Sequence, residues 1–186
     1  YISAQTRAIL EHFQKFSKDT ISKFKLTDKD LVLDIGSNDG SLLSYFKRNK
    51  TKVLGVDPAR NLTKIANKNG IETITGLFEK KIIKKIKNKY QNPKIITAFN
   101  VFAHTAKLRE MLFTIKSILD DDGVFIFEVQ YLGDIFNKKI LGTFFHEHMY
   151  HHSVTSLNKF FNFYDMTLFD VQRANIQKGS IIGYVC

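Results

Sequence analysis

The residues from Leu31 to Gly40 constrain the fold most, because a short apolar run leads there into an acid and a glycine-rich turn. A short continuous apolar run is typical of a strand that is buried on both faces of a parallel sheet. Gly36 and Gly40 have no Cβ atom, so the backbone can turn sharply and approach a ligand closely. The amphipathic run 41–48 follows, and the N-terminus of that helix would face the same place. The sequence therefore predicts a ligand cradle at the carboxyl end of a first strand.

The residue types around this turn select the ligand. A dinucleotide site needs a middle glycine that lets the backbone touch the pyrophosphate, and here that position is Asn38. Asp34 places a negative charge beside the loop, which suits a cation better than a phosphate. A second buried run, 52–57, ends at Asp57, where an acid accepts hydrogen bonds from ribose hydroxyls. The alternative is an ordinary strand-to-helix turn without a ligand.

The acid, the glycine turn and Asp57-Pro58 together resemble motif I and the second-strand motif of class I S-adenosylmethionine methyltransferases. This resemblance implies S-adenosylmethionine as the cofactor, whose sulfonium and ammonium groups match an acidic cradle. The adenine is then expected near Gly76-Leu77-Phe78, after the third strand. Phe78 would pack on the base, or it would simply belong to the core. Asn100, which follows the fourth strand, lies where the methyl group would be delivered.

The whole chain alternates between strand and helix patterns, which predicts an α/β fold. Strands are expected at 31–35, 52–57, 71–75, 94–100, 124–129, 167–172 and 181–185. Helices are expected at 3–25, 41–48, 61–69, 80–89, 107–119 and 153–164. Parallel βαβ units place helices on both faces of the sheet, and the short connection 173–180 makes the last strand antiparallel. We therefore expect a Rossmann-like, seven-stranded, mostly parallel sheet of the class I methyltransferase type.

Length and composition limit the cellular setting. At 186 residues the chain fits one domain, or one domain and a small piece. No apolar run is long enough to cross a bilayer, no signal-peptide pattern opens the chain, and the single cysteine is Cys186. We therefore expect a cytoplasmic protein with no membrane partner, no internal disulfide and no cysteine-based zinc site. Because the chain begins at Tyr1 without a methionine, we expect a fragment of a longer protein.

The net charge of +10 raises the question of an acidic partner. The densest cluster of lysines lies at 80–89, where Ile82, Ile83 and Ile86 recur at helical spacing. We interpret these lysines as the solvated face of an amphipathic helix, in preference to a surface that binds nucleic acid.

A histidine-rich segment, residues 142–152, follows the fifth strand and should lie over the same edge of the sheet as the cofactor loop. It contains His146, His148, His151 and His152, and His104 follows the fourth strand. Three interpretations stay open. One of His104, His146 and His148 acts as a general base, because imidazole titrates near neutral pH. Alternatively, this segment with Glu147 binds a metal ion, although its spacing is not His-Glu-x-x-His. The third interpretation is that these histidines are structural.

The chain also resembles a narrower family, the sugar C-methyltransferases that act on nucleotide-linked 4-keto deoxysugars. The resemblance covers the whole chain, and its most specific pieces are Asn-x-x-Ala-His at 100–104 and His-Glu-His at 146–148. Further matching pieces are Val32–Gly40, Gly55–Pro58, Phe127–Leu132, Tyr1-Ile2-Ser3, His12-Phe13 and Gly179-Ser180. The resemblance implies a nucleotide-linked sugar as the substrate. It also implies an N-terminal zinc module and a C-terminal domain, both of which lie outside this sequence.

The resemblance assigns roles to single residues. His148 would remove the C3 proton that the 4-keto group acidifies, and Glu147 would orient His148 or bind the sugar. His104 and Tyr1 would hydrogen-bond the sugar or the enolate oxygen, and a donor there would stabilise the developing charge. His146, Phe145 and Asn100 complete the expected sugar site. Phe145 stands where the family usually has tyrosine, so one hydroxyl contact to the substrate is missing.

The predicted organisation is an N-terminal helix, residues 1–28, that borders the site, followed by a methyltransferase domain, residues 29–186. The expected cofactor residues are Asp34, Gly36, Asn38, Gly40, Asp57, Pro58, Leu77, Phe78 and Asn100. Two rival functions stay open. One is a methyltransferase for an oxygen or nitrogen acceptor on a small molecule. The other is a non-catalytic or RNA-binding module that uses the lysine-rich face, whose binding would weaken steeply with salt. The sequence leaves the sugar, the nucleotide and the oligomeric state open.

Overall fold

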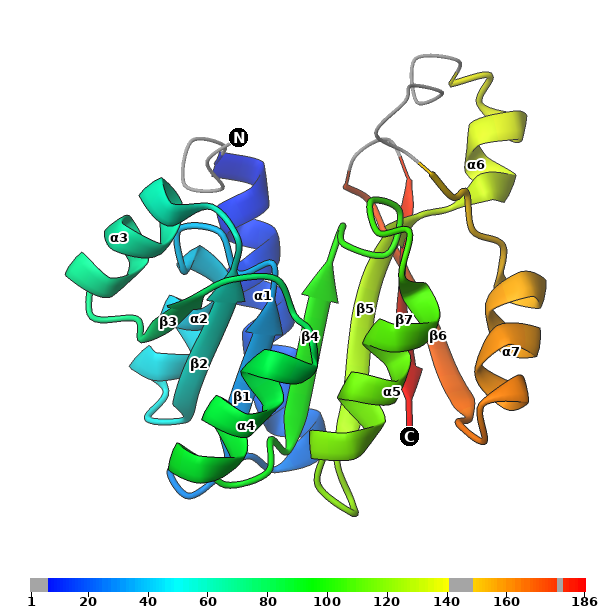
Figure 1. Cartoon of the computed structure of the whole chain (residues 1–186). Helices are drawn as coiled ribbons and strands as arrows, with labels where there is room; N and C mark the ends of the chain where they lie inside the picture. Colours follow the sequence, from blue (N-terminus) through cyan, green and yellow to red (C-terminus); the bar gives the residue numbers. More distant parts are fainter. Residues whose placement is uncertain (1–6, 141–148, 177–178) are drawn as a thin grey trace.

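The structure is a computed structural model, and it describes residues 7–140, 149–176 and 179–186. Its centre is a seven-stranded sheet with the strand order β3-β2-β1-β4-β5-β7-β6 (Figure 1). The strands are β1 (Leu31–Ile35), β2 (Lys52–Asp57), β3 (Thr73–Thr75), β4 (Ile95–Phe99), β5 (Val124–Gln130), β6 (Leu168–Ala174) and β7 (Ser180–Val185). The helices are α1 (Arg7–Phe24), α2 (Ser41–Arg48), α3 (Arg60–Lys68), α4 (Lys80–Lys89), α5 (Leu108–Ile118), α6 (Leu132–Asn137) and α7 (Val154–Phe163).

The pairing of the strands confirms the predicted sheet. β1 lies between β2 and β4 and is parallel to both, and β4 and β5 are also parallel. β7 enters between β5 and β6 and runs antiparallel to both of them. All five residues of β1 are buried, as expected for a central strand that is covered on both faces.

Helices cover the two faces of the sheet, and each face has its own apolar core. One core gathers side chains of α4, α5 and α7 with strand residues such as Leu33, Phe125 and Phe127. The opposite core gathers α1, α2 and α3 side chains, including Phe16, Phe46 and Ala66. Figure 1 shows α4 and α5 in front of the sheet and α1 behind it. Burial of these apolar surfaces on both faces is the main force that holds the layers together.

Element boundaries differ from the sequence prediction at a few places. β3 begins at Thr73, because the backbone N–H of Ile71 donates to the Ala66 carbonyl and so closes the end of α3. The helix expected at 61–69 spans Arg60–Lys68, and the helix expected at 3–25 is described as Arg7–Phe24. The sequence analysis missed α6, which has only six residues and therefore shows no clear helical period.

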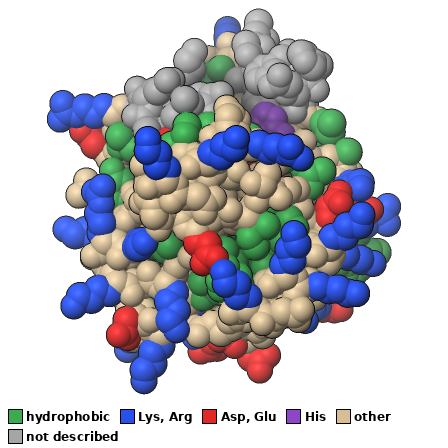
Figure 2. Space-filling view, turned by 60° about the vertical axis from the view of Figure 1, so that its left-hand side comes forward, with side chains coloured by type: hydrophobic (Ala, Val, Ile, Leu, Met, Phe, Trp, Pro, Cys, Tyr) green, Lys and Arg blue, Asp and Glu red, His purple; other side chains and the backbone are tan. Residues whose placement is uncertain are grey.

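The lysine-rich segment confirms its predicted helix. In α4, Ile82 and Ile86 are buried while most of its lysines are exposed. On the face that Figure 2 shows, Lys and Arg side chains are scattered among other residues and form no continuous patch. None of the helices in the described part of the chain combines the length and apolar character that a membrane span requires.

Candidate functional site

A cavity of about 770 Å³ opens at the carboxyl ends of β1, β2, β4 and β5, and residues of α1 also line it. This is the place where ligands bind in open α/β sheets. It collects nine of the site residues predicted from the sequence: Asp34, Gly36, Asn38, Asp57, Pro58, Leu77, Phe78, Asn100 and His104. Gly40 does not line the cavity and is instead the N-cap residue of α2.

The described lining is rich in acids. Five carboxylates lie along the wall, together with a single lysine, Lys107: the acids are Asp34, Asp57, Glu79, Glu110 and Glu128. Such a wall favours a ligand that carries positive charge, because opposite charges attract strongly where water is scarce.

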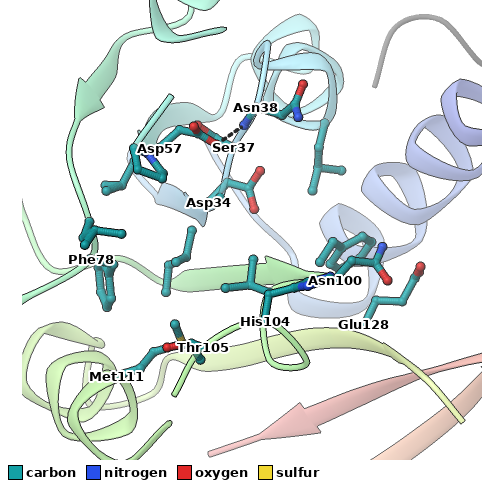
Figure 3. A pocket seen from close by; sticks show the side chains of 18 of the residues that line it. Asp34, Ser37, Asn38, Asp57, Phe78, Asn100, His104, Thr105, Met111 and Glu128 are labelled. Atoms are coloured by element: carbon teal, nitrogen blue, oxygen red, sulfur yellow. Dashed lines mark hydrogen bonds between the residues drawn. The ribbon is translucent and has the colours of Figure 1, made fainter. Parts of the chain in front are cut away.

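The loop after β1 is held in shape by Asp57 at the end of β2. The Asn38 backbone N–H donates to Asp57 Oδ2 at 2.9 Å, as the dashed line in Figure 3 shows. Asp57 Oδ1 accepts a second bond, at 2.8 Å, from the backbone N–H of Ala59 before α3. Asp57 therefore links two loops through backbone donors, and each of its oxygens keeps a further lone pair for a ligand hydroxyl.

Gly36 allows the loop to pass close to its neighbour. Its φ is +73°, and a Cβ atom at this position would lie 2.6 Å from Val101 Cγ2. Asn38 also has a positive φ, 53°, which is more accessible to asparagine than to most residues. The turn after β1 thus needs the residue types that the sequence supplies there.

Asp34 is the most perturbed carboxyl of the site. It is 4% exposed, and the Thr97 hydroxyl donates to its Oδ1 at 2.6 Å. Burial raises the pKa of Asp34 to about 7, the Thr97 hydrogen bond lowers it, and the nearby charge of Asp57 raises it. The carboxyl therefore changes its charge near neutral pH, and a cation beside it would favour the ionised form.

Two regions of the cavity are distinguished by position in Figure 3. Asp57 and Phe78 lie toward one end, Asn100 and Glu128 lie toward the other, and Asp34 lies between them. Phe78 belongs to the apolar core, as one of the two expectations for it held, and it also lines the cavity. Leu77 beside it is exposed. The first end is therefore apolar around Phe78 and acidic around Asp57.

Asn100 and His104 lie in the connection after β4. The Asn100 backbone N–H donates to the Glu128 carbonyl at 2.8 Å, and Asn100 has a left-handed φ of 58°. His104 follows in a turn closed by its own N–H to the Val101 carbonyl at 3.0 Å. Both residues line the cavity, so the structure brings them to the expected carboxyl edge.

The sequence analysis assigned no role to an imidazole–carboxylate pair that the structure reveals. His12 Nε2 of α1 lies 2.5 Å from Glu128 Oε2 of β5, and both residues line the cavity. The only signals in the sequence were an acid inside the apolar strand Phe127-Glu128-Val129 and a histidine on the apolar side of α1. Neither signal identifies the partner, because 116 positions separate the two residues.

The histidine-rich segment is only partly visible. Tyr1, Phe145, His146, Glu147 and His148 lie outside the described residues. No group of three or more histidine, cysteine, aspartate or glutamate side chains that could hold a metal ion occurs within the described ranges.

Of the described histidines in this segment, His152 is buried. Its ring packs near Phe102, with 6.2 Å between the ring centroids. Burial lowers the pKa of His152, a hydrogen bond with the Phe102 backbone raises it, and the charge of His151 lowers it. His152 does not line the main cavity and instead lines a second pocket beside Phe102 and α7.

The sequence of this chain is similar to that of known proteins. The methyltransferase domain family matches residues 5–175 of the chain. C-methyltransferase NovU from Streptomyces niveus is 34% identical over 182 residues, which cover 98% of this chain and 43% of that protein. The chain therefore spans less than half the length of this relative.

Solved structures share the architecture. Magnesium protoporphyrin IX methyltransferase (ChlM) from Synechocystis PCC 6803, with bound SAH, matches with a TM-score of 0.69 and 16% identity, over 92% of this chain and 82% of that one. An S-adenosylmethionine-dependent methyltransferase from Clostridium acetobutylicum ATCC 824 matches with a TM-score of 0.72 and 13% identity, over 98% and 92% of the two chains. At these identities the similarity concerns the fold alone, and that fold is the Rossmann-like one predicted from the sequence.

Proposed function

This chain belongs to the methyltransferase domain family and is an S-adenosylmethionine-dependent methyltransferase, and from this premise we propose that it methylates a carbon atom of a nucleotide-linked 4-keto deoxysugar. The observation that supports the carbon acceptor most is the 34% identity to a C-methyltransferase along nearly the whole chain. The sugar is supported by the Asn-x-x-Ala-His and His-Glu-His pieces at 100–104 and 146–148.

The residues of the cavity fit the cofactor. Its volume of about 770 Å³ lies in the range of small-molecule sites. A Cβ atom at Gly36 would lie 2.6 Å from Val101 Cγ2, so the glycine allows the loop to pass close to Val101 beside the cavity. We assign Asp57 to the ribose hydroxyls, Phe78 with Leu77 to the adenine, and Asp34 to the ammonium group. When bound, S-adenosylmethionine supplies an electrophilic methyl group on a positively charged sulfur.

The proposed chemistry at the acceptor begins with a proton. The 4-keto group acidifies the neighbouring C3–H, and His148 takes this proton as a general base. His104 and Asn100, which lie together after β4, are proposed to hold the acceptor where its negative charge develops. The resulting carbon nucleophile would then take the methyl group, with the methyl–sulfur bond breaking and neutral S-adenosylhomocysteine leaving. Glu147 orients His148 in this proposal, and Tyr1, Phe145 and His146 contact the sugar.

Hydrogen exchange tests the carbon acceptor directly. The protein is incubated in deuterated water with a thymidine-diphosphate-linked 4-keto deoxyhexose and without cofactor, and deuterium at C3 is followed by proton NMR. Enzyme-dependent incorporation is expected, because a base that removes the C3 proton also returns deuterium. Absence of exchange despite calorimetrically confirmed sugar binding would favour an oxygen or nitrogen acceptor.

A matched pair of variants tests the base. His148→Ala should abolish exchange and methyl transfer while the affinity for S-adenosylhomocysteine, measured by calorimetry, stays within about threefold of wild type. His151→Ala, three positions away, serves as the control and should keep exchange. If His148→Ala retains most of its exchange rate, His148 is not the base.

A further inference from the structure

The pair formed by His12 and Glu128 lies at the end of the cavity that the cofactor assignments leave open. The two side chains are 17% and 2% exposed, respectively. Figure 3 places Glu128 beside Asn100 and away from Asp57 and Phe78. The Asn100 N–H also donates to the Glu128 carbonyl, so the pair is directly connected to the segment that carries the proposed acceptor contacts.

The surroundings of the pair are apolar. The ring centroid of His12 lies 6.1 Å from that of Phe13 and 6.1 Å from that of Phe99, and Ile9 and Ile176 line the same cavity. Moving a carboxylate and an imidazole from water into such surroundings costs free energy, which their mutual attraction only partly returns. A pair of apolar side chains would fill this space at lower cost.

Contacts other than this pair also attach α1 to the rest of the molecule. Phe16 packs on Phe99 with 4.7 Å between the ring centroids and also contacts Phe46 at 6.2 Å. Lys23, near the other end of α1, forms an ion pair with Asp170 of β6. Because these contacts already dock the helix, a purely structural role leaves the cost of the buried pair unexplained.

The pair leaves one ring nitrogen available. A carboxylate only accepts hydrogen bonds, so the ring presents Nε2–H to Glu128. In the neutral ring the lone pair then resides on Nδ1, and among the described residues no hydrogen-bond partner is present for this atom. A carboxylate that holds one nitrogen of an imidazole fixes both its tautomer and its orientation.

We propose that His12 is an acceptor-binding residue whose Nδ1 accepts a hydrogen bond from a hydroxyl group of the acceptor, and that Glu128 is the positioning residue that holds the ring. The hydroxylated acceptor rests on the proposed function, whereas the fixed tautomer rests on the geometry of the pair alone. In this proposal the pair favours an acceptor that has a hydroxyl group close to the atom that Asn100 contacts.

The decisive variant replaces both groups by apolar side chains of similar size, His12→Phe/Glu128→Leu. The fold and the S-adenosylhomocysteine affinity should stay at the wild-type level, since no charge remains buried. The KM for a thymidine-diphosphate-linked 4-keto deoxyhexose should rise about tenfold or more, as expected for one lost hydrogen bond to an oriented group. Lys15→Ala/Asp19→Ala, which removes an exposed ion pair of the same helix, is the matched control and should leave KM unchanged.

A wild-type KM in the folded double apolar variant would overturn the proposal and leave the pair a structural role. Nitrogen NMR of the histidine-labelled wild type provides a second reading that needs no substrate and no variant. Under alkaline conditions the His12 ring should carry its proton on Nε2 and none on Nδ1, both with and without S-adenosylhomocysteine. A proton on Nδ1 would overturn the proposal even if the sugar proved not to be a substrate, whereas failure of the sugar alone would overturn the proposed function.

Discussion

The two ends of the cavity are built in different ways. The end around Asp34 and Asp57 is formed by loops after adjacent strands, and backbone hydrogen bonds from Asn38 and Ala59 hold it. The end around Glu128 depends on a side chain of α1, His12, that is far away in sequence. The first end is therefore encoded by a motif that is local in the sequence, whereas the second depends on a contact between residues that are far apart in the sequence. Substitutions should separate the two ends.

Asp34→Asn should have the largest effect on stability. The folded-state pKa of Asp34, about 7, is above its ordinary value of 3.8, so the native protein retains a proton that the unfolded chain has released between these values. The free energy of unfolding of wild type should therefore fall as the pH rises from about 4 to about 7, by about 4 kcal/mol from this group. Denaturant unfolding at several pH values should show that the variant lacks this loss and is the more stable protein at pH 8, with weaker cofactor binding.

A second substitution tests whether Asp34 causes this pH dependence of stability. Thr97→Val removes the hydroxyl that donates to Asp34 and should shift the loss of stability to higher pH, because the hydrogen bond lowers the pKa. A stability curve of Asp34→Asn that parallels wild type from acid to neutral pH would show that Asp34 does not titrate in this range.

Asp57→Ala should come next, and its effect is on binding. The carboxylate holds two backbone N–H groups and is assigned to the ribose, so its loss should weaken S-adenosylhomocysteine binding by about a hundredfold. Calorimetric titration measures this change. Asp121→Ala, in the exposed turn before β5, is the control and should bind as wild type. An unchanged affinity for Asp57→Ala would remove the ribose assignment.

Gly36→Ala should destabilise the fold by a smaller amount. Alanine at φ +73° is strained, and its Cβ would also press on Val101. Gly70→Ala shares the strain, at φ +77°, but its nearest atom is Lys47 Nζ at 3.5 Å, the end of a flexible side chain. The difference between the two variants in the free energy of unfolding, about 1–2 kcal/mol, isolates the close approach beside the cavity. Equal losses would show that the contact with Val101 relaxes freely.

The sequence predicted the end of the cavity around Asp34 and Asp57 better than the end around Glu128, because only the first end is formed by residues close together in the sequence. The boundaries of β1, α2 and β2 follow from apolar runs and glycines within a few residues of each other, and the structure places Asp34, Asn38 and Asp57 together as the motif requires. The pairing of His12 with Glu128 could not be predicted, because periodicity reports which face of an element is buried and not which distant side chain meets it. α6 escaped because six residues are too few to reveal a period.

Asn100 is expected to contact both the cofactor and the acceptor, and Asn100→Gly should have the smallest effect on stability while it decides which of the two the side chain serves. Its φ of 58° suits glycine, but glycine also gains freedom in the unfolded chain, so the two terms should cancel to within about 0.5 kcal/mol. With the backbone thus preserved, only the side-chain amide is lost. If Asn100 serves the acceptor, the S-adenosylhomocysteine affinity stays within about threefold and the KM for the keto sugar rises about tenfold. A tenfold weaker cofactor affinity with an unchanged KM would instead assign Asn100 to the cofactor end and leave His12 and His104 as the described polar contacts of the acceptor.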